Sequence, residues 1–330
     1  MKALIQCLLL VGLLSGCGSL VIKQELEPQH AIICKRVPTS PGDAAVLTTQ
    51  DVQKNFKTFD ESVELKHDYL ICGEDKSKPP VILLHEMPGL ETKTIDYAVT
   101  LTKDFTVYVP LLMGEVYRDS LPSGFWDYIW AQEWEPQPKL GGSTLITQWL
   151  RKFVAEIAKS HPQQNIGIIG NCLTGALPLA LLDNPRVTRI VLAQPTLPMR
   201  TKLGFGGEQD LAISDSEWEL AKQRLNPNPI KYPPIRSLLP AKAYGTRFAL
   251  DTTAPIEKYE YLKRELGSGF LCRQITKAEY TVKDDDGKLL CEIPSGTHSS
   301  LIHGWQNCPK HPSEIRRQEV KAFLLNQLSM

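Results

Sequence analysis

The sequence predicts an α/β domain with a mainly parallel central sheet, helices on both faces and cap-like insertions. Two observations point to this class. The first is a set of short, continuous apolar runs, such as 81–85, which are typical of strands buried on both faces. The second is the alternation of these runs with segments of helical period, such as 144–159. Strands that alternate with helices at this spacing indicate a parallel sheet wound on both sides.

Composition excludes several classes of protein. The chain has 330 residues, of which 42% are hydrophobic and 22% are charged, as in an ordinary globular protein. This length suits one large α/β domain or two small ones. Lys+Arg and Asp+Glu both number 37. Because there is no basic excess, we expect no nucleic-acid partner.

The N-terminus has the pattern of a bacterial export signal. Lys2 is followed by an apolar stretch, 3–14, which is too short to span a bilayer. The stretch ends in Leu-Ser-Gly-Cys, which resembles a lipobox whose cysteine, Cys17, becomes lipidated. We therefore expect a lipoprotein signal peptide over 1–16 and a lipid anchor and tether over 17–42. An ordinary signal peptide that is cleaved nearby is the alternative.

The same signal predicts where the protein is found. Gly18 follows the cysteine, and no aspartate at this position argues for retention in the inner membrane. We expect a lipoprotein of the bacterial cell envelope that faces the periplasm, in the outer membrane. The lipid at the N-terminus is then its attachment to the membrane.

Residues 43–330 are expected to form a single domain. A hairpin of short strands is predicted at the sheet edge over 43–75, before the alternation begins. The predicted strands are 81–85, 105–109, 166–169, 187–192, 247–250 and 270–275, and the predicted helices are 92–103, 144–159, 173–182, 216–225, 256–266 and 313–328. Two insertions, about 111–142 and 196–240, interrupt this pattern. The first is rich in tryptophan, which favours a packed cap and, as a second role, the wall of a substrate pocket.

The segment 166–175 carries the most informative signal. An apolar run predicts a buried strand that ends in a sharp turn with Cys172 at its apex, and a helix is expected from Leu173. This order is that of a nucleophile elbow, in which a strained turn lifts the reactive side chain above the sheet. The N-terminus of the following helix would stabilise a thiolate there. Cysteine also fills space in apolar runs, so its partners decide between the two interpretations.

A thiol nucleophile needs a base, and the base needs an orienting carboxylate. Downstream of an elbow of this kind, the order is nucleophile, acid and histidine. Asp251 directly follows a predicted strand, and His298 lies in a Gly/Ser loop before the last helix. Each has an ordinary alternative, as a helix cap for the aspartate and as a solvated loop residue for the histidine. The rival bases are His303, His311 and His85.

Together these segments resemble the dienelactone hydrolase family, over roughly residues 60–328. The resemblance is carried by Gly170-Asn171-Cys172-Leu173-Thr174-Gly175, Asp251-Thr252-Thr253-Ala254-Pro255, Gly296-Thr297-His298-Ser299 and His85-Glu86-Met87-Pro88-Gly89-Leu90. It implies an α/β-hydrolase fold and a Cys172–His298–Asp251 triad that hydrolyses ester or lactone bonds of a small carboxylic substrate. It further implies that Glu86 lies next to the resting thiol.

The resemblance also implies how the transition state is stabilised. The backbone N–H groups of Met87 and Leu173 would form the oxyanion hole, and no metal or organic cofactor would be needed. Many family members have glycine two residues after the nucleophile, where this chain has Thr174, with Gly175 one position later. A substrate carboxylate would suit an arginine through bidentate contacts, and Arg118 and Arg200 are candidates, with surface solvation as the alternative for each.

Six cysteines lie beyond the signal segment, and an oxidising compartment favours disulfides among them. We expect Cys172 to be free. Cys272 and Cys291 are expected to pair, because both flank a short β segment and its turn at 284–287. Two other functions remain open from sequence: a binding protein that reuses the fold without catalysis, and a thioesterase or acyltransferase with the same triad.

Overall fold

The computed structural model describes residues 25–40, 42–117, 128, 130–196, 210–226, 228, 238–303 and 308–328. Three of the predicted functional residues, Cys17, Arg118 and Arg200, lie outside the described residues. The signal segment and parts of both insertions also lie outside the described residues.

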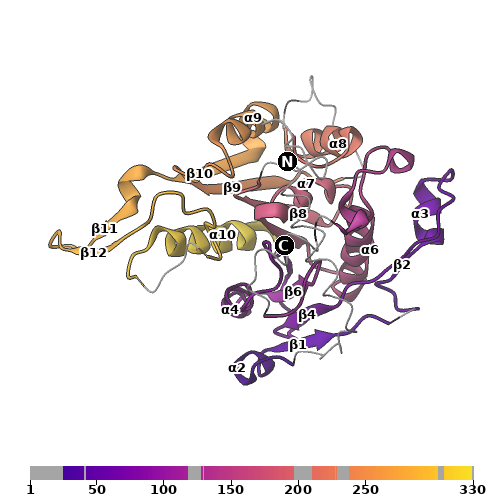
Figure 1. The fold of residues 1–330 in the computed structure, drawn as a ribbon, viewed down its shortest axis with the longest axis horizontal. Helices are drawn as coiled ribbons and strands as arrows, with labels where there is room; N and C mark the ends of the chain where they lie inside the picture. Colours follow the sequence, from indigo (N-terminus) through magenta and orange to yellow (C-terminus); the bar gives the residue numbers. More distant parts are fainter. Residues whose placement is uncertain are drawn as a thin grey trace, which may run out of the picture.

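An eight-stranded sheet runs through the centre of the molecule (Figure 1). Its order is β1-β4-β6-β5-β7-β8-β9-β10. From β6 to β10 all neighbours are parallel, whereas β4 runs antiparallel to both β1 and β6. The strands are β1 (Cys34–Val37), β4 (Tyr69–Cys72), β5 (Pro80–Leu83), β6 (Thr106–Pro110), β7 (Ile166–Asn171), β8 (Val187–Ala193), β9 (Lys242–Phe248) and β10 (Phe270–Ile275). The predicted parallel sheet is therefore confirmed.

Helices cover both faces of this sheet (Figure 1). One face packs against α4 (Thr92–Leu101) and α10 (Pro312–Leu328). The other packs against α6 (Leu145–Ser160), α7 (Leu177–Ala180), α8 (Asp215–Leu225) and α9 (Ile256–Leu266). Shorter elements are α2 (Pro28–Ala31), α3 (Thr49–Asn55), η1 (Gln132–Trp134), η2 (Pro138–Leu140), η3 (Cys172–Thr174), η4 (Gly267–Gly269) and η5 (Lys277–Tyr280).

Two hydrophobic cores follow from the alternation of side chains along each strand. In β5, Ile82 belongs to the core beneath α6 to α9, whereas Val81 and Leu83 belong to the core beneath α4 and α10. In β7, Ile168 and Ile169 divide between the two cores in the same way. Because both faces are covered, every position of such a strand is apolar, which explains the continuous runs in the sequence.

The N-terminal boundary of the domain lies earlier than expected. The strand β1 falls within the segment assigned to the tether, 17–42, yet it forms the edge of the main sheet. A disulfide joins Cys34 of β1 to Cys72 of β4. The boundary at residue 43 is therefore wrong, because a polar, charged strand at a sheet edge has no periodic apolar signal to reveal it.

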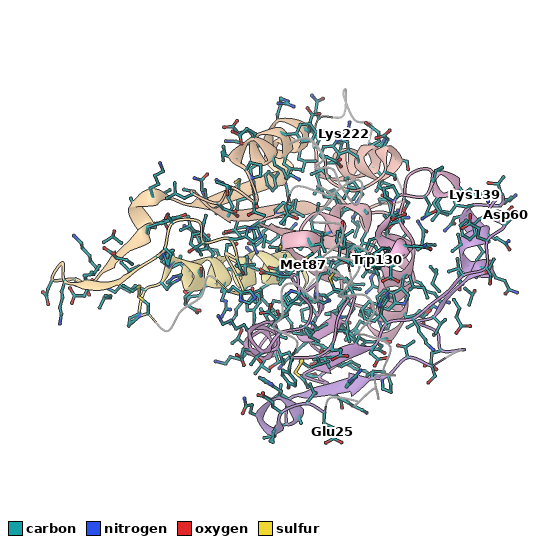
Figure 2. All side chains as sticks on the ribbon, in the orientation of Figure 1. Glu25, Asp60, Met87, Trp130, Lys139 and Lys222 are labelled. Atoms are coloured by element: carbon teal, nitrogen blue, oxygen red, sulfur yellow. A yellow bond between two sulfur atoms is a disulfide. The ribbon has the colours of Figure 1, made fainter. Side chains whose placement is uncertain are left out.

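The hairpin predicted over 43–75 is present only in part. β2 (Leu47–Thr48) and β3 (Glu64–Leu65) pair with each other in a separate two-stranded sheet, with α3 between them. Lys139 of the first insertion forms an ion pair with Asp60 of this region, and both lie at the periphery of the molecule (Figure 2).

The helix expected over 173–182 is also corrected. The chain forms the short 3₁₀ turn η3 and then the four-residue helix α7. Pro178 lacks the N–H that a continuous helix would bond to Thr174, which accounts for the break. The continuous helix whose N-terminus was expected to stabilise a thiolate is therefore absent after Cys172, and the four residues of α7 supply only a small aligned dipole.

The disulfide expected between Cys272 and Cys291 is wrong. Cys291 lies in a hairpin of β11 (Thr281–Lys283) and β12 (Leu289–Glu292), which projects from the body (Figure 1), and it pairs with Cys308. Cys272 lies in β10, packs against a hydrophobic core and is free. Cys172 is free, as expected.

No helix among the described residues is long and apolar enough to cross a bilayer.

The Cys34–Cys72 bond is expected to stabilise the domain. The double variant Cys34→Ala/Cys72→Ala should lower the free energy of unfolding by about 2–4 kcal/mol, because the bond restricts the unfolded chain. Chemical denaturation under non-reducing conditions measures this. Cys272→Ala is the control and should leave both disulfides intact in a non-reduced peptide map. A bond to Cys272 in the wild-type map would contradict the assignment.

Candidate active site

Cys172 directly follows β7, at the carboxyl end of the parallel strands, and has a strained backbone conformation. The residue has φ of 53°, in the left-handed region that non-glycine residues rarely adopt. Glycines on both sides make this turn possible. A Cβ on Gly170 would lie 2.5 Å from the Thr174 carbonyl oxygen, and one on Gly175 would lie 2.6 Å from Cα of Pro195. The local sequence thus has the backbone of a nucleophile elbow.

Thr174 explains how this elbow tolerates a residue other than glycine. Its hydroxyl is buried, accepts a hydrogen bond from the Asn171 N–H at 3.0 Å and lies 3.0 Å from the His85 carbonyl oxygen. The Thr174 side chain therefore links the turn to the segment after β5 by hydrogen bonds. The close approach that requires glycine occurs one residue later, at Gly175.

His298 and Asp251 come together from segments 47 residues apart. Nδ1 of the imidazole lies 2.7 Å from Oδ2 of the carboxylate. The other oxygen, Oδ1, accepts hydrogen bonds from the N–H groups of Thr253 and Ala254, at 2.9 and 3.1 Å. Both carboxylate oxygens are thus held, and the carboxylate fixes the orientation of the imidazole.

The buried Arg247 fixes the loop that carries Asp251. It comes from β9 and donates hydrogen bonds of 2.8 Å to the carbonyl oxygens of Asp251 and Ala254. Sequence reasoning assigned this arginine only to a strand. The sequence did not indicate that this side chain is buried, because arginine is almost always exposed unless it is paired.

The electrostatics of His298 favour the protonated ring. Burial by itself would lower the pKa, but the interactions of the ring with Asp251 and with the neighbouring Cys172 outweigh it and raise the pKa to about 11. Nε2 is buried and makes no hydrogen bond of ordinary geometry to any described residue. Cys172 and His298 line the same cavity. Catalytic hydrogen bonds are often long before substrate binds, so Nε2 is the atom available to the thiol.

Glu86 enters the site but takes a different role from the expected one. No hydrogen bond between described residues joins it to the thiol. Instead, Oε1 accepts hydrogen bonds from Gln194 Nε2 at 2.7 Å and from the Ser299 hydroxyl at 2.6 Å. Burial raises the pKa of this carboxyl group, opposed by His298 and His303. Glu86 therefore anchors the loop that carries His298.

Gln194 is a residue of the site that sequence reasoning missed. It follows β8, is fully buried and has φ of 35°. While its amide nitrogen donates to Glu86, its amide oxygen accepts from the Ser300 N–H at 3.0 Å and from the Ser300 hydroxyl. Its place at the carboxyl end of a parallel strand was the available signal, since ligand sites form at that edge of such sheets.

A second histidine, His303, lies in the same cavity. Its Nε2 is 2.5 Å from Glu91 Oε2 and 4.0 Å from Glu86 Oε2. Burial lowers the pKa of His303, but the two carboxylates outweigh it and raise the pKa above the ordinary value. His303, one of the rival bases, is thus paired with the carboxylate of Glu91. Glu91 is a further residue of the site that the sequence did not indicate.

The other rival histidines serve the backbone. His85 is fully buried, with Nδ1 2.7 Å from the Glu86 carbonyl oxygen, and Nε2 accepts the Leu112 N–H at 3.0 Å. Burial lowers the pKa of His85 to about 4, so the ring is neutral. His311 accepts the Ser313 N–H through Nδ1, at the start of α10. Neither lines a cavity with Cys172.

The expected oxyanion donors lie on either side of Cys172. Leu173 is in the first turn of η3, where N–H groups have no acceptor within the helix. Met87 lies near the middle of the molecule (Figure 2), in the loop after β5, and lines a cavity with Cys172 and His298. Its N–H makes no hydrogen bond to another described residue.

Two cavities meet at Cys172. The wide cavity, about 1590 Å³ of empty space including open solvent, is lined by Glu86, Met87, Glu91, Thr92, Lys93, Asp96, Cys172, Thr297, His298, Ser299 and His303. The narrow pocket, about 460 Å³ on the same measure, is lined by Tyr128, Trp134, Thr144, Ile146, Cys172, Leu173, Ala176, Leu177, Pro195, Thr196, Leu211 and Ala212. Aromatic residues of the first insertion therefore do wall a pocket beside Cys172.

The strand order and the three residues define the class of fold. When the eight strands of the main sheet are numbered in chain order, their spatial order is 1-2-4-3-5-6-7-8, and strand 2 is antiparallel. Cys172, Asp251 and His298 follow strands 5, 7 and 8. This is an α/β-hydrolase fold, and the three residues occur in the chain order in which this fold carries its nucleophile, acid and histidine. No family model and no curated protein matches the chain.

Solved structures give a more particular likeness. A structure described as a dienelactone hydrolase from Klebsiella pneumoniae matches with a TM-score of 0.51 and 13% identity, over 89% of this chain and 99% of that one. At this identity the match shows a dienelactone hydrolase-like fold. A dienelactone hydrolase from Anabaena variabilis matches with a TM-score of 0.48 and 10% identity, over 89% and 99% of the two chains.

The ion pair of His298 and Asp251 predicts a dependence of stability on pH. The folded state raises the pKa of His298 from 6.5 to about 11. The contribution to unfolding free energy is therefore complete below about pH 6.5 and decreases as the pH rises towards 11. The difference in unfolding free energy between wild type and His298→Gln should shrink from about pH 7 to about pH 9.5.

His311→Gln is the matched control for this titration. Burial lowers the pKa of His311, so this ring is neutral in both states over the same pH range. The difference from wild type should stay constant with pH. A difference for His298→Gln that stays constant or grows with pH would contradict the proposed charge on His298.

Proposed function

We propose that the protein is a hydrolase that cleaves ester or lactone bonds of a small carboxylic substrate through Cys172, His298 and Asp251. The observation that carries the proposal is the orientation of His298. One ring nitrogen is held 2.7 Å from Asp251, the other is buried, and Cys172 lies close enough to the ring to raise its pKa. A histidine that is oriented by a carboxylate beside a thiol on a strained turn is suited to nucleophilic catalysis.

The reaction follows from these positions. The Cys172 sulfur attacks the carbonyl carbon, and the thiol proton resides on His298 Nε2. The N–H groups of Met87 and Leu173 donate to the oxyanion, which is worth about 3 kcal/mol per donor in comparable sites. As the tetrahedral intermediate collapses, His298 gives its proton to the leaving oxygen and a thioester remains on Cys172. His298 then takes a proton from water, which hydrolyses the thioester and releases the acid.

The surrounding network keeps His298 in place during these steps. Glu86 and Gln194 hold the His298 loop through Ser299 and Ser300, each with hydrogen bonds among buried groups. Such a network is demanding to form but rigid once all its members are satisfied. In this proposal Glu86 is a positioning residue, and the expected contact with the thiol is not needed.

Hydrolysis of activated esters, thioesters and lactones tests the proposal. Cys172→Ala and His298→Ala should each lower kcat/KM by at least about a thousandfold, because the triad acts as a unit. Asp251→Asn should also be severe, because it reverses the hydrogen bond that orients the ring. Cys272→Ala removes the other free thiol of the described chain and should retain activity. Turnover that survives Cys172→Ala would place the site elsewhere, and a folded wild type without turnover would favour the binding-protein alternative.

We further propose that Cys17 carries a lipid and that the domain faces the periplasm. Support comes from the disulfides Cys34–Cys72 and Cys291–Cys308, because such bonds persist in oxidising compartments and are rare in the bacterial cytosol. The two bonds fasten peripheral parts of the fold, an edge strand and a projecting hairpin.

Cell fractionation tests the lipid anchor. The full chain should be found with the membranes and should enter detergent, whereas Cys17→Ser should lose the lipid-modified mass and leave the membrane fraction. Cys7→Ser, within the apolar part of the same signal, is the matched control and should behave as the wild type does. A Cys17→Ser protein that remains bound to membranes would contradict the proposal.

A further inference from the structure

We infer that the narrow pocket binds the acyl group of the substrate and that this group is short, apolar and uncharged. The inference rests on the proposed function. It goes further by naming the class of substrate: an acyclic ester or thioester of a small aliphatic acid, rather than a substrate whose acyl part carries a carboxylate.

The position of His298 decides which cavity holds which part of the substrate. The general acid must reach the leaving oxygen or sulfur, so the leaving group has to lie on the His298 side of the carbonyl carbon. His298 lines the wide cavity and does not line the narrow pocket. The acyl chain therefore extends into the narrow pocket.

The lining of the narrow pocket sets the character of that chain. Tyr128 and Trp134 pack edge to face with centroids 5.7 Å apart, and Leu177 and Leu211 are buried against the same space. None of the described side chains that line it is charged. A carboxylate at the end of an acyl chain would lose hydration there and would meet no charged side chain of the described lining, whereas a methyl group would gain apolar contacts.

The wide cavity has the opposite character. The carboxylates of Glu86, Glu91 and Asp96 border it together with Lys93 and His303. Such a wall suits a leaving group that carries hydrogen-bond donors. An acyclic substrate fills both spaces with separate parts, whereas the leaving oxygen of a small lactone stays tied to the acyl chain.

A matched pair of substrates tests the acyl group. The 4-nitrophenyl esters of butyric acid and of succinic acid have chains of equal length that end in a methyl group and a carboxylate. The full chain should hydrolyse the butyrate with a kcat/KM at least about tenfold higher. The octanoate should be a poorer substrate than the butyrate. A succinate ester that is preferred would overturn the inference and point to Arg118 or Arg200, while leaving the proposed hydrolase function intact.

Filling the pocket provides the second test. Ala176→Leu adds volume to a buried residue of the pocket wall and should lower kcat/KM for butyrate at least about tenfold more than for acetate. Ala158→Leu makes the same change on a partly buried face of α6, outside the pocket, and should leave the butyrate-to-acetate ratio unchanged. Equal losses for both esters would contradict the assignment of this pocket.

The rate of Cys172 alkylation measures occupancy of the narrow pocket without requiring turnover. Butyramide should slow the reaction of Cys172 with iodoacetamide, succinamate should not, and Ala176→Leu should remove the protection. Protection by succinamate that equals or exceeds protection by butyramide would overturn the inference. If butyramide protects Cys172 but the protein hydrolyses no ester, the assignment of the pocket would be correct and the proposed hydrolase function would be wrong.

Discussion

The strained turn at Cys172 is the constraint on which the rest of the candidate site depends. A positive φ at a cysteine persists only where the surrounding structure over-determines it. Here the backbone of the turn lies so close to Pro178 and Pro195 that only glycine fits at positions 170 and 175. The Thr174 hydroxyl then ties the turn to the segment after β5, which also carries Glu86 and Met87. The elbow and the segment that carries Glu86 and Met87 are therefore joined directly.

The second requirement is to hold a charged histidine beside that thiol in a buried place. His298 and His303 each face a carboxylate, Asp251 and Glu91, and both have a raised pKa despite burial. Glu86 lines the same cavity as both histidines, and its hydrogen bonds go to Gln194 and Ser299. In the proposed mechanism His298 is the imidazole that acts on the substrate, whereas His303 stays paired with Glu91 in the cavity wall.

The two cavities that meet at Cys172 differ in polarity because they are built by different parts of the chain. The wide cavity is bordered by α4 and the His298 loop, which bring carboxylates and histidines. The narrow pocket is bordered by the first insertion and by Leu211 and Ala212, just before α8, which bring aromatic and aliphatic groups. In proteins of this fold, loop variation over a constant sheet is what changes the substrate.

The sequence by itself determined the sheet, the elbow and the order of Cys172, Asp251 and His298, because these depend on local periodicity and on the chain order of the strands. Only the tertiary structure decided that Glu86 faces Gln194 and Ser299, that Cys291 pairs with Cys308, and that β1 belongs to the sheet. These features join residues far apart in the chain, and no local pattern encodes which distant partner a polar side chain or a cysteine will meet once the sheet has folded.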